Sequence, residues 1–258
     1  MHMHWDDLTF LHWAYHPDVI QALLPEGLTV DTYDDRGWIS LVPFVMRVIV
    51  PGDRHLLPFI GRFPETNVRT YVRTADGTQG IWFFSLDAGS ALATLGGRAG
   101  YRLPYMWSDM SVERNADTIE YHCRRRFPGP KGTPSRVQVS IGDTYEPSGL
   151  TDLDHWLSAR WRLYSVMFGR LWGAHAVHEQ WPLRHATLQR CDDDLVTAAG
   201  LPHPTGDPIV QFAERVTVRI GRPYRLPCAT CAVDAAACES ADHTDCRPDP
   251  KTLAGNGR

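Results

Sequence analysis

Two adjacent segments of this chain combine residue types that could bind and transform a small organic acid. The dipeptide Asp76-Gly77 separates two runs of strand-forming residues, which is a strong signal for a β-hairpin turn. A two-residue turn would place Ala75 opposite Thr78, and every second residue would then face the same side of the sheet. That side carries Glu65, Asn67, Arg69 and Tyr71 from the first strand and Trp82, Phe84, Leu86 and Ala88 from the second.

Such a mixture of charged and apolar side chains is typical of a ligand pocket. An arginine can bind a carboxylate through two parallel hydrogen bonds, and a glutamate or a tyrosine can move a proton. The alternative is a structural ion pair between Glu65 and Arg69 at one end of the sheet. A three-residue turn would also shift the register by one residue and exchange the two faces.

Other histidines and acids have structural interpretations. His12 could join the pocket, or it could be a packed histidine with its hydrogen bonds satisfied. His175 and His178 lack the spacing of a zinc-protease helix, which Pro182 would also break. We expect His178 to be hydrogen-bonded within the structure and Asp87 to cap the helix after it. No glycine pattern of a nucleotide site is present, so no cofactor is expected.

The end of the chain gathers four of the six cysteines. Cys228, Cys231, Cys238 and Cys246, with His243, offer enough soft ligands for zinc, although their spacing fits no zinc finger. The alternative is an incidental extension. Because residues 227–258 contain no aromatic residue and no periodicity, we expect a disordered tail after a single domain at residues 1–226.

Short runs of β-branched and aromatic residues predict strands in most of the chain. The expected strands are Thr9–Trp13, Leu28–Tyr33, Trp38–Val50, Asn67–Thr74, Gln79–Ala88, Ser108–Glu113, Thr118–Arg126, Arg136–Ile141 and Pro208–Ile220. Helices are expected at Asp18–Leu24, Ser90–Leu95, Leu153–Tyr164 and Asp194–Ala199. Thr151 and Asp154 have the spacing of a capping box. We therefore predict a mainly β fold, an antiparallel β-barrel with a few peripheral helices.

The composition excludes several other classes of protein. With 258 residues, 43% of them hydrophobic and 22% charged, the chain is neither disordered throughout, collagen-like nor a coiled coil. A net charge of −4 argues against nucleic acid as a partner, and Arg124-Arg125-Arg126 is explained by the end of a strand. No stretch approaches the ~20 apolar residues that span a bilayer, so we expect a cytoplasmic protein without a membrane partner. Trp161, Trp172 and Trp181 fit either the core or the interface of a homo-oligomer.

Several strings follow one family pattern. They are Leu8–Trp13, Leu24–Leu28, Trp38–Phe44, Glu65–Val72, Phe83–Ala88, Leu103–Tyr105 and His178–Leu183. Together they resemble the YqjF-like family of uncharacterised bacterial proteins over nearly all of residues 5–226. That family looks like a distant branch of the acetoacetate decarboxylase-like superfamily, so the resemblance implies a cone-shaped β-barrel around a ligand cavity.

The same resemblance bears on the chemistry. In acetoacetate decarboxylase a lysine forms a Schiff base with a keto acid, and it follows a Gly-Arg segment and a proline. This chain keeps Gly97-Arg98 and Pro104 but has Tyr105 where the lysine should stand. The two lysines of the chain, Lys131 and Lys251, lie in segments that we expect to be hydrated, where an amine stays protonated. We therefore expect no decarboxylation through an imine.

These observations predict a protein that binds a small oxo or hydroxy acid in a barrel cavity. It would be a lysine-independent lyase, hydratase or isomerase with Glu65, Arg98 and Tyr105 as catalytic residues. Asn67, Arg69, Tyr71, Trp82, Phe84 and His12 are the candidate ligand-binding residues, and no metal site is expected among them. The alternatives are a non-catalytic binding protein and a zinc or redox protein acting through the C-terminal cysteines.

Overall fold

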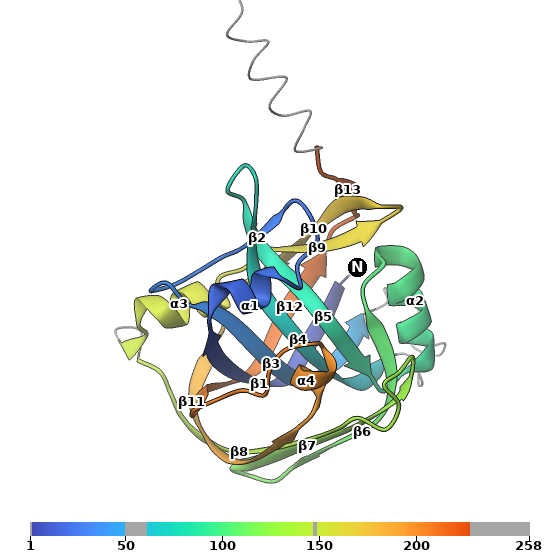
Figure 1. Ribbon diagram of the computed structural model, residues 1–258. Helices are drawn as coiled ribbons and strands as arrows, with labels where there is room; N and C mark the ends of the chain where they lie inside the picture. The colour runs from blue at the N-terminus through green and yellow to red at the C-terminus, as the bar shows by residue number, and fades with distance from the viewer. Residues whose placement is uncertain (1, 50–60, 147–148, 228–258) are drawn as a thin grey trace, which may run out of the picture. The chain divides into compact units, whose positions relative to one another are not determined.

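One continuous sheet of thirteen strands builds the computed structural model, which describes residues 2–49, 61–146 and 149–227 (Figure 1). The strands are β1 His2–Tyr15, β2 Leu28–Val30, β3 Gly37–Ile49, β4 Arg62–Thr74, β5 Gln79–Ala88, β6 Tyr105–Arg114, β7 Thr118–Phe127, β8 Pro134–Thr144, β9 Arg162–Met167, β10 Arg170–His178, β11 Leu183–Asp193, β12 Ile209–Ile220 and β13 Tyr224–Arg225. The helices are α1 Pro17–Gln21, α2 Ala91–Tyr101, α3 Asp152–Ser158 and α4 Leu195–Ala198.

The sheet closes on itself because some strands have an additional neighbour. β4 pairs with β5, and β10 pairs with β12. These pairings complete the closed circuit β1-β3-β4-β5-β9-β10-β12, which we call the inner ring. Strands β6, β7, β8 and β11 continue the sheet from β5 round to β12 and form an outer layer along one side of the ring (Figure 1). Only β6 and β9 run parallel to their neighbour β5 among the described pairs, so the expected mainly antiparallel, closed sheet is confirmed.

Two large apolar clusters follow from this arrangement. The first lies inside the inner ring and includes Phe10, Phe44, Phe83 and Ala176. The second, which includes Leu41, Val68, Tyr121 and Val139, lies between the ring and the outer layer. Strands of the ring that separate the two clusters are therefore buried on both faces, and side chains of alternate residues enter different clusters.

The predicted strands are present and several are longer than expected, although β2 ends at Val30 instead of Tyr33. The strands β9, β10 and β11 were missed. The helix expected at Leu153–Tyr164 is wrong in its second half, because α3 ends at Ser158 and β9 begins at Arg162. The capping box at its start is confirmed. The β9–β10 turn escaped prediction because Phe168 and Gly169 both have positive φ, 52° and 69°. That conformation suits a two-residue hairpin turn, but phenylalanine rarely adopts it.

None of the helices among the described residues is long and apolar enough to cross a membrane. Residues up to Leu226 form one compact unit. The C-terminal cysteines fall outside the described residues.

Candidate functional site

The inner face of β4 carries a row of buried polar side chains. Glu65, Asn67, Arg69 and Tyr71 alternate along the strand and therefore share one face. Glu65 is 1% exposed and Arg69 is 4% exposed. Because Arg69 lies over the ring of Phe10, which belongs to the cluster inside the inner ring, this face of β4 points into the ring. The sequence prediction that these four residues lie together is confirmed.

The aromatic partners predicted from β5 lie elsewhere. The turn has three residues, since the N–H of Thr74 donates to the carbonyl of Thr78, and a bulge at Phe84 restores the predicted register further along. Glu65 and Asn67 therefore oppose Ala88 and Leu86 as predicted, whereas Arg69 opposes Phe83 and Tyr71 opposes Ile81. As a result Trp82 packs against Leu28, Val72 and Tyr164, and Phe84 packs into the cluster behind the outer layer. Neither Trp82 nor Phe84 faces the interior of the ring.

Glu65 is buried and forms no ion pair with any described residue. The hydroxyl of Tyr105 donates to Glu65 Oε2 at 3.3 Å. Burial raises the pKa of Glu65 to about 8, against the opposing effect of hydrogen bonds from Tyr105 and Asn67. Burial, followed by the charge of Glu65, raises the pKa of Tyr105 well above its usual value. At neutral pH Glu65 is therefore largely the neutral acid, able to give a proton.

Helix α2 fixes the position of Tyr105. Gly97 lies against the tyrosine ring, where a Cβ atom would come within 2.3 Å of Tyr105 Cδ2. Arg98 is exposed and donates from Nη1 to the carbonyl oxygen of Tyr105 at 2.6 Å. The expected catalytic role of Arg98 inside the ring does not fit this placement, because its guanidinium lies outside the ring interior and holds the backbone of Tyr105.

Arg69 is a buried cation that has no ion pair in the part of the chain that the structure describes. Its guanidinium carbon lies 5.5 Å from the centroid of the Phe10 ring. Among the described residues no ion pair joins Arg69 to Glu65, which removes the alternative of a structural pair between them. Arg69 Nε and the neighbouring Asn67 Oδ1 are both buried and have no hydrogen-bond partner among the described residues.

His12 belongs to a hydrogen-bonded group beside Arg69. Its Nδ1 lies 2.7 Å from Ser40 Oγ and 3.3 Å from the hydroxyl of Tyr71. Burial, followed by the positive charge of Arg69, lowers the pKa of His12 to about 3. His12 is therefore neutral at physiological pH, and it is both a packed histidine and a neighbour of the polar row.

Several residues of this interior were not selected from the sequence. The ring centroids of Phe10 and Trp181 are 5.2 Å apart. Together with Trp5 and Phe44 these rings form an aromatic wall beside the polar row. Alternation along β1 would have placed Phe10 on the face of His12. Arg160 could not have been found, because it was assigned to a helix.

Arg160 closes the polar row at the α3 end of the ring. Its Nη2 donates to Asp31 Oδ2 at 3.0 Å, and its guanidinium carbon lies 5.2 Å from the centroid of the Tyr71 ring and 4.4 Å from that of Trp156. Asp31 also accepts from Arg73 and Gln79. Arg160 thus has a carboxylate partner, in contrast to Arg69.

Other residues discussed from the sequence have structural roles. His178 makes hydrogen bonds to the carbonyl oxygens of Glu179 and Arg160, as expected. Asp87 does not cap α2, whose N-cap is Ser90, because both of its oxygens accept hydrogen bonds from the buried Arg125. Lys131 is exposed, and Lys251 lies outside the described residues.

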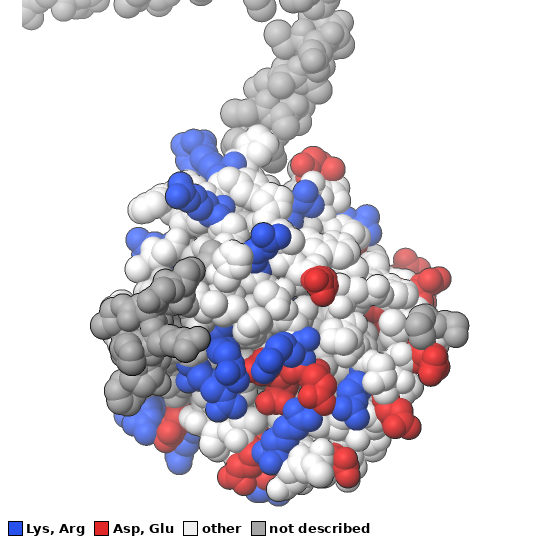
Figure 2. Space-filling view, turned by 180° about the vertical axis from the view of Figure 1, so that it is seen from behind, with Lys and Arg blue, Asp and Glu red and all other residues white. Residues whose placement is uncertain are grey.

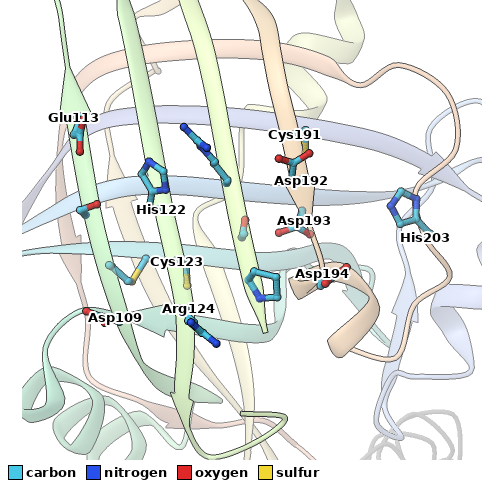
Figure 3. A pocket seen from close by; sticks show the side chains of 15 residues that line it. Asp109, Glu113, His122, Cys123, Arg124, Cys191, Asp192, Asp193, Asp194 and His203 are labelled. Carbon is cyan, nitrogen blue, oxygen red and sulfur yellow. The ribbon is translucent and has the colours of Figure 1, made fainter. Parts of the chain in front are cut away.

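A surface hollow of about 870 Å³ lies over the outer layer, away from this interior (Figure 3). Its lining includes Asp109, His122, Arg124, Asp192 and His203, and none of the residues of the polar row. Among the described residues no group of three or more His, Cys, Asp or Glu side chains is arranged to hold a metal ion.

Comparison with known sequences places the chain among uncharacterised proteins. The family model DUF2071, described as an uncharacterized conserved protein, matches residues 2–217. The uncharacterized protein YqjF of Bacillus subtilis (strain 168) is 35% identical over 219 residues, which cover 84% of this chain and 89% of that protein.

Solved structures share the fold at low sequence identity. The enduracididine biosynthesis enzyme MppR with HEPES buffer bound has a TM-score of 0.65 at 13% identity and covers 87% of both chains. The same enzyme complexed with pyruvate gives 0.63 at 13% identity, over 88% of this chain and 90% of that one. An acetoacetate decarboxylase-like enzyme from Sphingomonas wittichii RW1 gives 0.60 at 14% identity, over 88% and 92%. The expected acetoacetate decarboxylase-like fold is thereby confirmed.

Proposed function

This chain belongs to the DUF2071 family of uncharacterized conserved proteins, and from that premise we propose that it binds a small oxo or hydroxy acid inside the inner ring. One observation carries the proposal: Arg69 is a buried cation without an anionic partner among the described residues. The pyruvate complex of the structural neighbour MppR supports the class of ligand.

The charge of Arg69 is the reason for expecting an acid. Removing a guanidinium from water costs several kcal/mol unless an anion and hydrogen bonds replace the water. The buried Arg125 and Arg160 meet this requirement with Asp87 and Asp31. For Arg69 a ligand carboxylate would supply the missing charge, with Asn67 and the aromatic wall beside it.

The Glu65–Tyr105 end of the row is suited to proton transfer. A protonated glutamate can donate to the carbonyl or hydroxyl oxygen of the ligand and then act as a base in the return step. This chemistry needs no lysine, in keeping with Tyr105 at the lysine position of the superfamily. We assign Glu65 and Tyr105 as the proton-transferring pair, Arg98 as a positioning residue, and Asn67, Tyr71 and His12 as the surroundings of the bound acid.

The binding proposal is tested by titrating pyruvate and lactate, together with longer oxo and hydroxy acids, into the wild-type protein and the Arg69→Met variant. We expect saturable binding of at least one acid to the wild type, weakened by roughly 30- to 1000-fold in the variant, because such a pair contributes about 2–4 kcal/mol. Equal binding to both proteins, or no binding to the wild type, would contradict the proposal.

A non-catalytic binding protein is the second candidate, because the same lining serves both functions. NMR of the bound acid over time separates them, since an enzyme converts the acid and a binding protein returns it unchanged. Borohydride treatment in the presence of pyruvate is expected to leave the mass of the protein unchanged. A covalent adduct would overturn the lysine-independent mechanism.

A further inference from the structure

A second cluster of charged residues lies on the outer surface, where β1, β3, β4, β6 and β12 approach one another. It lines a hollow of about 380 Å³, which we call the arginine hollow; its residues are Asp6, Asp7, Arg47, Arg62, Arg114, Glu214 and Arg215. The face of the molecule in Figure 2 shows basic and acidic side chains interleaved in such a patch. The hollow shares no residue with the polar row inside the ring.

The acids of the hollow hold most of its arginines in place. Asp6 is 4% exposed and accepts hydrogen bonds from Arg47 at 3.1 Å and from Arg215. Glu214 accepts from Arg114 at 3.0 Å and from Arg184, just outside the lining, at 2.7 Å. Guanidinium groups fixed in this way are preorganised, so binding a ligand costs little side-chain entropy.

The cations outnumber the acids. Asp7 pairs with Arg114, which Glu214 already binds, so three carboxylates serve four paired arginines. Arg62 has no ion pair or hydrogen-bonded partner among the described residues. Counting the five arginines Arg47, Arg62, Arg114, Arg184 and Arg215 against Asp6, Asp7 and Glu214 leaves two positive charges uncompensated.

The register of the sheet brings two of these arginines together. Arg62 on β4 lies directly opposite Arg47 on β3. Like charges that face each other across neighbouring strands are destabilising, and an anion between them reverses that effect. Arg62, already counted in the charge surplus, therefore also lies where a bound anion would relieve the repulsion from Arg47.

We propose that the arginine hollow binds a phosphate group. A phosphate has a charge of about −1.5 to −2 at neutral pH and several strong acceptor oxygens, which match two surplus guanidinium charges. A monocarboxylate would neutralise only one of them. Free phosphate and the phosphate of a small phosphorylated metabolite offer the same chemistry.

The test is calorimetric titration of the full-length protein with inorganic phosphate and, separately, with ribose 5-phosphate. Low ionic strength is used because surface charges are screened by salt. Arg62→Gln removes no hydrogen bond or ion pair to any described residue, so it is expected to fold normally. Arg170→Gln is the matched control, because Arg170 is exposed on β10 and has no ion pair among the described residues.

We expect saturable binding to the wild type, weakened about tenfold or more in Arg62→Gln and unchanged in Arg170→Gln. Equal affinity for the two probes would show that the phosphate group alone accounts for binding. Tighter binding of ribose 5-phosphate would show that the hollow takes a phosphorylated metabolite. Absence of saturable binding of either probe, or equal weakening in both variants, would overturn the proposal.

Discussion

Two buried arginines, Arg125 and Arg69, differ in whether a carboxylate pairs with them, and this difference should appear in the free energy of unfolding. Arg125 donates to both oxygens of the buried Asp87, whereas Arg69 has no carboxylate partner among the described residues. Arg125→Met would leave Asp87 as an unpaired buried charge and should cost about 3–5 kcal/mol of unfolding free energy. Arg69→Met replaces an unpaired charge by an apolar side chain and should leave the unfolding free energy unchanged or raise it.

Urea unfolding of the two variants without added ligand checks this contrast. Because both variants replace a buried arginine by methionine, the loss of packing is similar in the two proteins. A loss of 3 kcal/mol or more in Arg69→Met would show that Arg69 is a structural residue and not a ligand-binding one.

The pKa of Glu65 predicts how stability depends on pH. Because burial raises this pKa from 4.5 to about 8, the folded state binds the proton more tightly than the unfolded state between these values. The stabilisation that the protonated Glu65 adds to the free energy of unfolding is fully present below pH 4.5 and is lost as the pH rises toward 8. His12, with its pKa lowered to about 3, acts in the opposite direction, and its contribution is lost as the pH falls below 6.5.

Between pH 6.5 and 8 the contribution of Glu65 changes most, and comparison with Glu65→Gln cancels the small remaining change of His12. The wild type should lose about 2 kcal/mol over this range relative to Glu65→Gln, because one proton accounts for about 1.4 kcal/mol per pH unit. Unfolding curves of both proteins at these two pH values provide the comparison. If the free energies of unfolding of the wild type and of Glu65→Gln changed equally between the two pH values, Glu65 would have an ordinary pKa.

At the scale of elements, a single hairpin shows how far the sequence could be interpreted. The alternation of Glu65, Asn67, Arg69 and Tyr71 depends only on β4 being a strand, so the face that they share was predicted correctly. The choice of Trp82 and Phe84 depended on the length of the turn and on the absence of a bulge. A bulge at Phe84 is set by packing against non-local strands, and no local pattern indicates it.

Helix α2 makes a prediction at the same scale. Gly97→Ala would place a Cβ atom against the ring of Tyr105, so the ring must move and its hydrogen bond to Glu65 must lengthen or break. We expect a loss of about 1–3 kcal/mol in unfolding free energy. Gly96→Ala is the control on the same helix, because no other atom lies within 4 Å of its Cβ position. That control should gain about 0.5–1 kcal/mol from helix propensity.

Denaturant unfolding distinguishes the two glycine variants. Equal stabilisation of both would show that Tyr105 is free to move away from α2, and the assignment of α2 as its support would then be wrong.

At the scale of the whole molecule, the closed sheet explains why charged side chains can be gathered in the interior. The β4–β5 hairpin and the pairing of β10 with β12 complete the inner ring. The number of strand-like runs predicted a closed sheet, but the strands that close it, β9 and β10, were missed. In β10 the exposed Arg170 and His175 and the partly buried Trp172 hide the alternation on which strand prediction depends. Arg160 was missed because residues 153–164 were assigned to a single helix, whereas alternation along β1 would have placed Phe10.

The central claim is that the interior of the ring holds an organic acid against Arg69. The most direct measurement is a crystal structure of the protein soaked with pyruvate. We predict density inside the inner ring, with the carboxylate hydrogen-bonded to Arg69 and the oxo group toward Glu65 and Tyr105. A structure in which pyruvate lies only on the outer surface, or in which the interior stays closed around Arg69, would contradict the claim.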